Sequence, residues 1–133
     1  MKAYLFLLLA TCFAASLVSC SSPGEKVAST FKGTYSGSAA HTGGETKICT
    51  ITVPQEGNPV TGTFVILTGS VREEGTLEGS VLGTILTLTL KSSNGGKSYT
   101  LDGETSDNNS SITGTLSYFD GTTFRKYTGT FKR

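Results

Sequence analysis

Few residues of this 133-residue chain have the types and spacing that chemistry requires. His41 is the only histidine and stands in a His-Thr-Gly-Gly turn, where a general base or metal ligand would still need partners. Asp102, Glu104 and Asp107 are spaced loosely like oxygen ligands of calcium, but the full pattern of carboxylates and the glycine turn are missing. Solvated charges are therefore the favoured interpretation. With no Ser-His-Asp set, metal cluster or phosphate-binding loop, the sequence predicts a protein that is not an enzyme and needs no cofactor.

Three further positions leave two interpretations each. Cys49 shares a strand face with Ile51, which indicates a buried inert thiol rather than the exposed thiolate of a reactive cysteine. The charged run 72–74 is expected in an exposed loop, with partner binding as the alternative. Arg125 has the strand phase of Tyr127 and should point inward. It would then either reach solvent at the end of the fold or anchor an anionic group of a ligand.

The N-terminus begins with Lys2 and an apolar stretch that runs from Leu5 to about Val18, which is typical of a signal peptide. A membrane span would need about 20 apolar residues, so this stretch is too short to cross a bilayer comfortably. The stretch ends in Leu-Val-Ser-Cys, which resembles the lipobox of bacterial lipoproteins. This resemblance implies a signal peptide over 1–19, lipidation of Cys20 and a lipidated tether over 20–29. Ser21 in place of aspartate implies sorting to the outer membrane in a diderm host. The alternative is an ordinary signal peptide that is cut elsewhere.

Composition limits what the remaining chain can be. Removing 1–19 leaves 114 residues, enough for one domain, with ten acidic and ten basic side chains. A net charge near zero argues against nucleic acid or an acidic lipid surface as a partner. The 17 glycines, many threonines and absence of tryptophan suit an all-β domain with many turns. Cys12 leaves with the signal peptide and Cys20 carries the lipid, so Cys49 has no disulfide partner.

One five-residue pattern recurs along the mature chain: a large apolar residue, a polar residue, Gly-Thr, and a second large residue. In a strand, the two large residues and the glycine share one face. The glycine removes bulk where the sheet must curl or where a neighbouring ring must cross the backbone. The pattern occurs at Phe31–Tyr35, Val60–Phe64, Ile112–Leu116 and Tyr127–Phe131.

The chain predicts about eight strands, near 30–40, 46–53, 60–68, 75–81, 86–90, 99–103, 112–119 and 123–132, with no helix after the signal peptide. Short connections favour an antiparallel up-and-down meander that closes as a barrel over 30–133. The segment 69–74 is expected to be the least regular part. Because the large residues share one face, that face should line the interior, and the lipid rather than the barrel wall should contact the membrane.

The Gly-Thr-aromatic strands resemble those of avidin-like and lipocalin-like barrels, and more closely the short Gly/Thr-rich lipoproteins of bacteria. Avidins hold biotin with tryptophans, which this chain lacks, so biotin binding is not implied. The main hypothesis is a lipid-anchored envelope protein that binds a small apolar or amphipathic ligand at one end of the barrel. The expected binding residues are Tyr35, Phe64, Tyr99, Tyr118, Arg125 and Tyr127. The alternatives are a protein-interaction module, either an inhibitor or an envelope assembly factor, that uses loops such as 69–74, and an enzyme.

Overall fold

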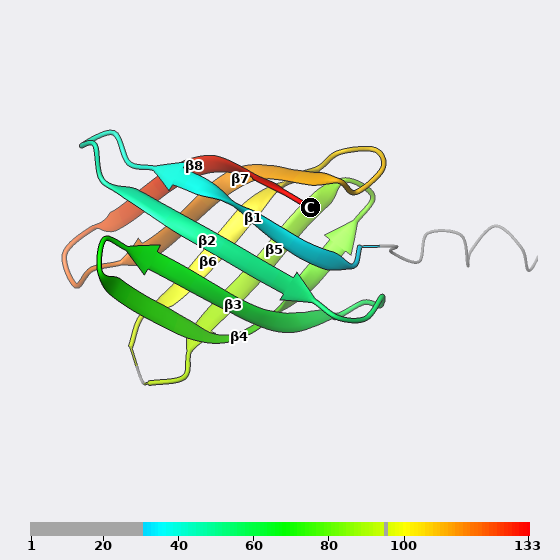
Figure 1. Cartoon of the computed structure of the whole chain (residues 1–133), viewed down its shortest axis with the longest axis horizontal. Coiled ribbons are helices and arrows are strands. Elements are labelled where there is room, and N and C mark those ends of the chain that lie inside the picture. The colour runs from blue at the N-terminus through cyan, green and yellow to red at the C-terminus, as the bar shows by residue number, and fades with distance from the viewer. Residues whose placement is uncertain (1–30, 95) are drawn as a thin grey trace, which may run out of the picture.

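The recurring strand pattern produces one closed sheet in the computed structural model, which describes residues 31–94 and 96–133. This part of the chain is all-β, and each strand pairs antiparallel with its sequence neighbour until β8 pairs with β1 (Figure 1). The strands are β1 (Gly33–Ala40), β2 (Thr46–Val53), β3 (Val60–Thr68), β4 (Val71–Leu82), β5 (Ile85–Ser92), β6 (Ser98–Thr105), β7 (Ser111–Phe119) and β8 (Phe124–Lys132). The predicted eight-stranded up-and-down barrel is thus confirmed.

The predicted signal peptide, lipobox and tether all lie outside the described residues. Within the described part, no helix has the length and hydrophobicity needed to cross a membrane.

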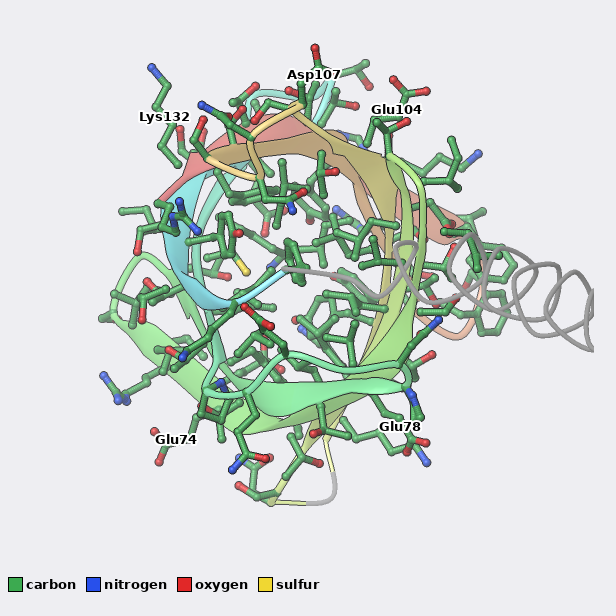
Figure 2. All side chains as sticks on the ribbon, turned by 90° about the vertical axis from the view of Figure 1, so that its right-hand side faces the viewer. Glu74, Glu78, Glu104, Asp107 and Lys132 are labelled. Carbon is green, nitrogen blue, oxygen red and sulfur yellow. The ribbon has the colours of Figure 1, made fainter. Side chains whose placement is uncertain are left out.

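The faces of the strands are as the alternation predicts. Both large residues of every copy of the pattern are buried: Phe31, Tyr35, Val60, Phe64, Ile112, Leu116, Tyr127 and Phe131. The threonines beside them lie outside, where Thr63 of β3 is exposed. Among the described residues, 21 apolar side chains are buried and fill the space that the sheet encloses. Figure 2, seen from the right-hand side of Figure 1, shows side chains crowding the inside of the ring while Glu74, Glu78 and Glu104 point away from it.

The inner glycines serve a neighbouring backbone rather than a neighbouring ring. A Cβ atom on Gly62 would lie 3.0 Å from the carbonyl carbon of Thr52 and would overlap the oxygen of that carbonyl. Gly129 has the same relation to the carbonyl of Ser38 on β1. Of the two expected reasons for these glycines, the structure supports the tight curl of the sheet, because adjacent strands approach one another too closely for a side chain.

The largest departure from the sequence-based expectation is in β4. This strand begins at Val71 rather than near residue 75, because the turn before it is only two residues long. Gly69 forms that turn with a φ of 61°, which suits glycine. The expected loop over 72–74 is therefore wrong, because these residues are strand. Arg72 and Glu74 are exposed as expected, but Glu73 is 8 % exposed.

Candidate functional site

The candidate site lies at the end of the barrel that carries the loops 41–45, 69–70, 93–97 and 120–123, here called the mouth. It is the left-hand end in Figure 1, opposite the start of β1 and the end of β8. A pocket of about 540 Å³ opens there, within the usual range of roughly 300–1,000 Å³ for small-molecule sites. Its lining residues are Glu45, Lys97, Tyr118, Phe119, Asp120, Thr122 and Arg125.

A lysine is buried behind this pocket. Lys47 is 1 % exposed because β2 places it on the inner face, two residues before Cys49. Its ammonium group donates a hydrogen bond of 2.7 Å to the hydroxyl of Thr68. The same ammonium lies 4.9 to 5.9 Å from the ring centres of Tyr127, Tyr118 and Tyr99. Three aromatic faces within about 6 Å stabilise a cation that has left water.

Charges of alternating sign connect this lysine to the rim. Glu45 lies 3.5 Å from the Lys47 ammonium with one oxygen and 3.6 Å from the Arg125 guanidinium with the other. Arg125 in turn donates from Nε to the Asp120 carboxylate at 2.9 Å. Arg125 is therefore held between two carboxylates, and its side chain is 42 % exposed at the mouth.

The two carboxylates differ in how firmly they are held. Asp120 accepts bonds from the backbone N–H groups of Thr123 and Thr122, both at 2.9 Å. The Thr123 N–H, the Arg125 guanidinium and the Thr122 N–H hold the Asp120 pKa at about 2. Partial burial raises the pKa of Glu45. The neighbouring Tyr127 hydroxyl and the positive charges of Lys47 and Arg125 favour the ionised carboxylate more strongly, so the pKa is lowered. Asp120 thus fixes the β7–β8 turn, whereas the Glu45 side chain makes two long ion pairs and no hydrogen bond within 31–94 and 96–133.

One polar atom near the floor of the mouth is unsatisfied. The Tyr127 hydroxyl is buried and makes no hydrogen bond with any described residue. Burial raises its pKa first, and the nearby Tyr118 and Glu45 raise it further. The Tyr127 ring lies parallel to that of Tyr118 with 6.3 Å between centres, and the His41 ring packs on it at 5.4 Å. A buried hydroxyl without a partner costs about 1–3 kcal/mol, so a ligand group that forms a hydrogen bond with it would bind favourably.

A buried carboxylate, that of Glu73, lies at the same end of the barrel near the start of β4. Glu73 accepts a hydrogen bond from the Tyr99 hydroxyl. Burial, the bond to Glu73 and the Glu73 charge all raise the pKa of Tyr99. The phenol therefore stays protonated and keeps Glu73 in place.

The structure brings together some of the six predicted binding residues and separates others. Tyr118, Arg125 and Tyr127 meet at the mouth, and Tyr99 touches Tyr118 edge-on with 5.1 Å between ring centres. Phe64 is 1 % exposed and reaches the mouth only through Tyr99.

Tyr35 belongs to the opposite end of the barrel. Its ring stacks on Phe31, and its hydroxyl donates to the Asn109 carbonyl at 2.6 Å. A single ligand at the mouth therefore cannot contact both Tyr35 and Tyr118.

Sequence reasoning missed Glu45, Lys47 and Lys97, and it assigned Glu73 to an exposed loop. Two of these four carried a signal: Lys47 has the strand phase of Cys49, and Glu73 has the phase of Leu77, which is buried. The other two lie next to turns, where strand phase does not apply.

Of the remaining chemical candidates, His41 adjoins the site through its ring contact with Tyr127, whereas Cys49, Asp102 and Glu104 are not among the lining residues of the pocket. Cys49 is fully buried, and burial raises the pKa of its thiol to about 12. His41 accepts a bond from the Gly43 N–H at 2.8 Å within its own turn. Asp102 and Glu104 are exposed on β6. Over 31–94 and 96–133, no group of three or more His, Cys, Asp or Glu side chains is arranged to hold a metal ion.

A larger hollow of about 610 Å³ lies on the outer face over β3, β4 and β5. Hydroxyl and charged side chains such as Thr61, Thr76, Thr89 and Lys91 line it, together with Leu77, and no aromatic ring does. The mouth pocket is the stronger candidate because Tyr118 and Phe119 line it, and because Tyr127, whose buried hydroxyl is unsatisfied, stacks on Tyr118.

Fold and site together define an eight-stranded up-and-down β-barrel with a filled interior and a polar pocket at one end. No protein-family model matches this chain, and the comparisons with curated proteins and with solved structures likewise found no match. The resemblance to avidin-like and lipocalin-like barrels and to bacterial lipoproteins stays a prediction.

Proposed function

We propose that this protein is a non-enzymatic, lipid-anchored lipoprotein of the cell envelope that binds a small amphipathic ligand at the mouth of its barrel. The observation that carries the proposal is the pocket of about 540 Å³ over a filled interior, with Tyr118 and Arg125 among its lining residues. The ligand is therefore bound at the rim, where an aromatic ring meets charged groups.

The position of the pocket is consistent with anchoring at the N-terminus. β1 begins and β8 ends at one end of the barrel, and the mouth is at the other. A lipid on Cys20 would attach ahead of β1, so the mouth would face away from the membrane surface, which in a diderm host is the outer membrane. Lipid anchoring itself rests on the resemblance of the N-terminus to a lipobox.

Native mass spectrometry of the purified protein tests ligand binding. Thr122 is an exposed lining residue, and Thr122→Trp should fill part of the pocket. Thr128→Trp adds the same bulk on the outer face of β8 and serves as the control. We expect a small molecule to remain bound to the wild type and to the Thr128 variant, and to be lost from the Thr122 variant. A bound molecule that survives Thr122→Trp would place the site elsewhere, and the absence of any bound molecule would count against the proposal.

A second candidate function is protein recognition, the alternative expected from the sequence. Phe119 and Phe124 are 55 % and 68 % exposed at the β7–β8 turn, with 5.2 Å between ring centres. Exposed paired aromatic rings are typical of interface anchors. Phe119 also lines the mouth pocket, whereas Phe124 does not, so Phe124 is the residue to change. If Phe124→Ser abolishes cross-linking to an envelope protein but leaves small-molecule binding intact, this second function is favoured.

A further inference from the structure

The Glu45 carboxylate lies between two cationic side chains, so its position suits an anion. Lys47 lies 3.5 Å from one of its oxygens and Arg125 lies 3.6 Å from the other. Among the described residues, neither contact is a hydrogen bond, although both donors are charged. Charge-assisted hydrogen bonds are normally about 2.7–2.9 Å long. The Tyr127 hydroxyl nearby also lacks an acceptor. Three donors therefore surround a carboxylate that satisfies none of them fully.

We propose that Lys47, Arg125 and Tyr127 form a carboxylate-binding site, that Glu45 is its loosely seated internal occupant, and that the ligand of the mouth carries a carboxylate that displaces Glu45. This inference rests on the proposed function, since it names the chemical class of that ligand.

Glu45 can be displaced because its side chain is partly exposed and comes from a loop. It immediately precedes β2 at the end of the 41–45 loop, and its side chain is 38 % exposed. Asp120, by contrast, is fixed by two backbone N–H groups and by Arg125. When a ligand carboxylate replaces Glu45, one negative charge leaves for water as another enters. The ammonium of Lys47 is thus never left buried without an anion, which would be costly.

The other charges of the mouth favour an anion over a cation. Lys97 places its ammonium 4.8 Å from the ring centre of Tyr118, and no described carboxylate lies within ion-pairing distance of it. Of the two carboxylates that line the pocket, Asp120 is already bonded to Arg125 and two backbone N–H groups, which leaves Glu45 to pair with a cationic ligand. Lys47, Lys97 and Arg125 would repel that cation, whereas a carboxylate would gain from all three. The Tyr118 ring on the pocket wall suits an apolar or aromatic body attached to that carboxylate.

Three probes of similar shape separate charge from shape: phenylacetate, phenylacetamide and 2-phenylethylammonium. Each is titrated by NMR into the wild type, Glu45→Gln, Tyr127→Phe and Lys47→Met. Lys126→Gln removes the same charge from an exposed position on the outer face of β8 and is the matched control. Tyr127→Phe removes only an unpartnered hydroxyl, so it keeps the test valid should Lys47→Met fail to fold.

We expect phenylacetate to shift resonances of the mouth and to bind about fivefold to tenfold more tightly to Glu45→Gln, because the internal competitor is gone. Tyr127→Phe and Lys47→Met should weaken phenylacetate about tenfold or more, and Lys126→Gln should leave it unchanged. A merely structural role of Glu45 would not raise affinity for one charge type.

The opposite results overturn the inference. Glu45→Gln that leaves phenylacetate binding unchanged or weaker would show that Glu45 is not a competitor. Tighter binding of the amide or the ammonium at the mouth would refute the carboxylate while leaving small-ligand binding intact. If none of the probes binds the wild type or Glu45→Gln, the inference fails, and the proposed function is then judged separately by native mass spectrometry.

Discussion

The close approach of β2 and β3 at Gly62 gives the sharpest test of the fold. In Gly62→Ala the added Cβ would meet the Thr52 carbonyl, with the carbonyl carbon at 3.0 Å and the Val53 Cα at 3.3 Å. The Thr52 oxygen is closer still, so the strands would have to separate by about 1 Å. Because the obstacle is backbone, no side-chain rotation relieves it.

The expected cost follows from two opposing effects. Overpacking of this kind costs roughly 1–3 kcal/mol, and separating the strands also weakens ladder hydrogen bonds. Alanine restricts the unfolded chain and returns about 0.4–1 kcal/mol. A net loss of about 2 kcal/mol should lower the urea midpoint by about 1–2 M, given a slope of about 1–2 kcal/mol/M.

Thr63→Val is the control, since Thr63 is exposed on the outer face of the same strand. Its urea midpoint should stay close to that of the wild type, because valine also suits a strand. If Gly62→Ala is as stable as the wild type, or if Thr63→Val is the more damaging change, the assignment of faces and the reason for the inner glycines are both refuted.

Four other predictions concern single groups. The Cys49 thiol should react with a disulfide reagent only as fast as the barrel unfolds, and rapid reaction of the folded protein would contradict its burial. The Asp120 carboxyl should titrate in a ¹³C NMR experiment near pH 2 rather than 3.8. The stability it adds is then complete above about pH 4 and lost as the pH falls toward 2, and a midpoint near 3.8 would show that its bonds are absent in solution. Lys47→Met should change the free energy of unfolding by no more than about 1 kcal/mol, because the Glu45 carboxylate left behind is 38 % exposed and stays hydrated, and a loss above about 3 kcal/mol in a denaturant titration would make the ammonium structural. Cys20→Ala should move the protein out of the membrane fraction, and continued sedimentation with membranes, together with no fatty-acid labelling of the wild type, would refute lipidation.

The sequence predicts the faces of the strands well because alternation is a local property. Every large residue of the repeated pattern is buried where the pattern places it, from Phe31 to Phe131. The same rule places Lys47 and Glu73 inside, yet a charged residue is ordinarily assigned to solvent. Only the structure shows the tyrosine rings and the Thr68 hydroxyl that make the burial of Lys47 tolerable.

The alternation of residues along a strand predicts which face a side chain is on, but not its position along the barrel axis. Tyr35 and Tyr127 both point inward, and each lies near the start of its strand. Because β1 and β8 run in opposite directions, the two rings lie at opposite ends of the barrel. The Glu45 and Lys97 side chains enter the pocket from or beside turns, whose course depends on contacts between distant segments. The sequence likewise allows two reasons for Gly62, a curl of the sheet or a neighbouring ring, and the close approach of the Thr52 backbone selects the first.

The ladder between β1 and β8 has a consequence for the newly made chain. It pairs Ser36 with Lys132, whereas every other ladder joins strands that are adjacent in sequence. One edge of β1 therefore stays open until β8, the last of the described strands, has followed it, which for the proposed lipoprotein means out of the membrane. An edge left open is a template for pairing with another chain. The β1 sequence, GTYSGSAA, contains no valine, leucine or isoleucine, so the strand that waits longest is also a poor seed for aggregation.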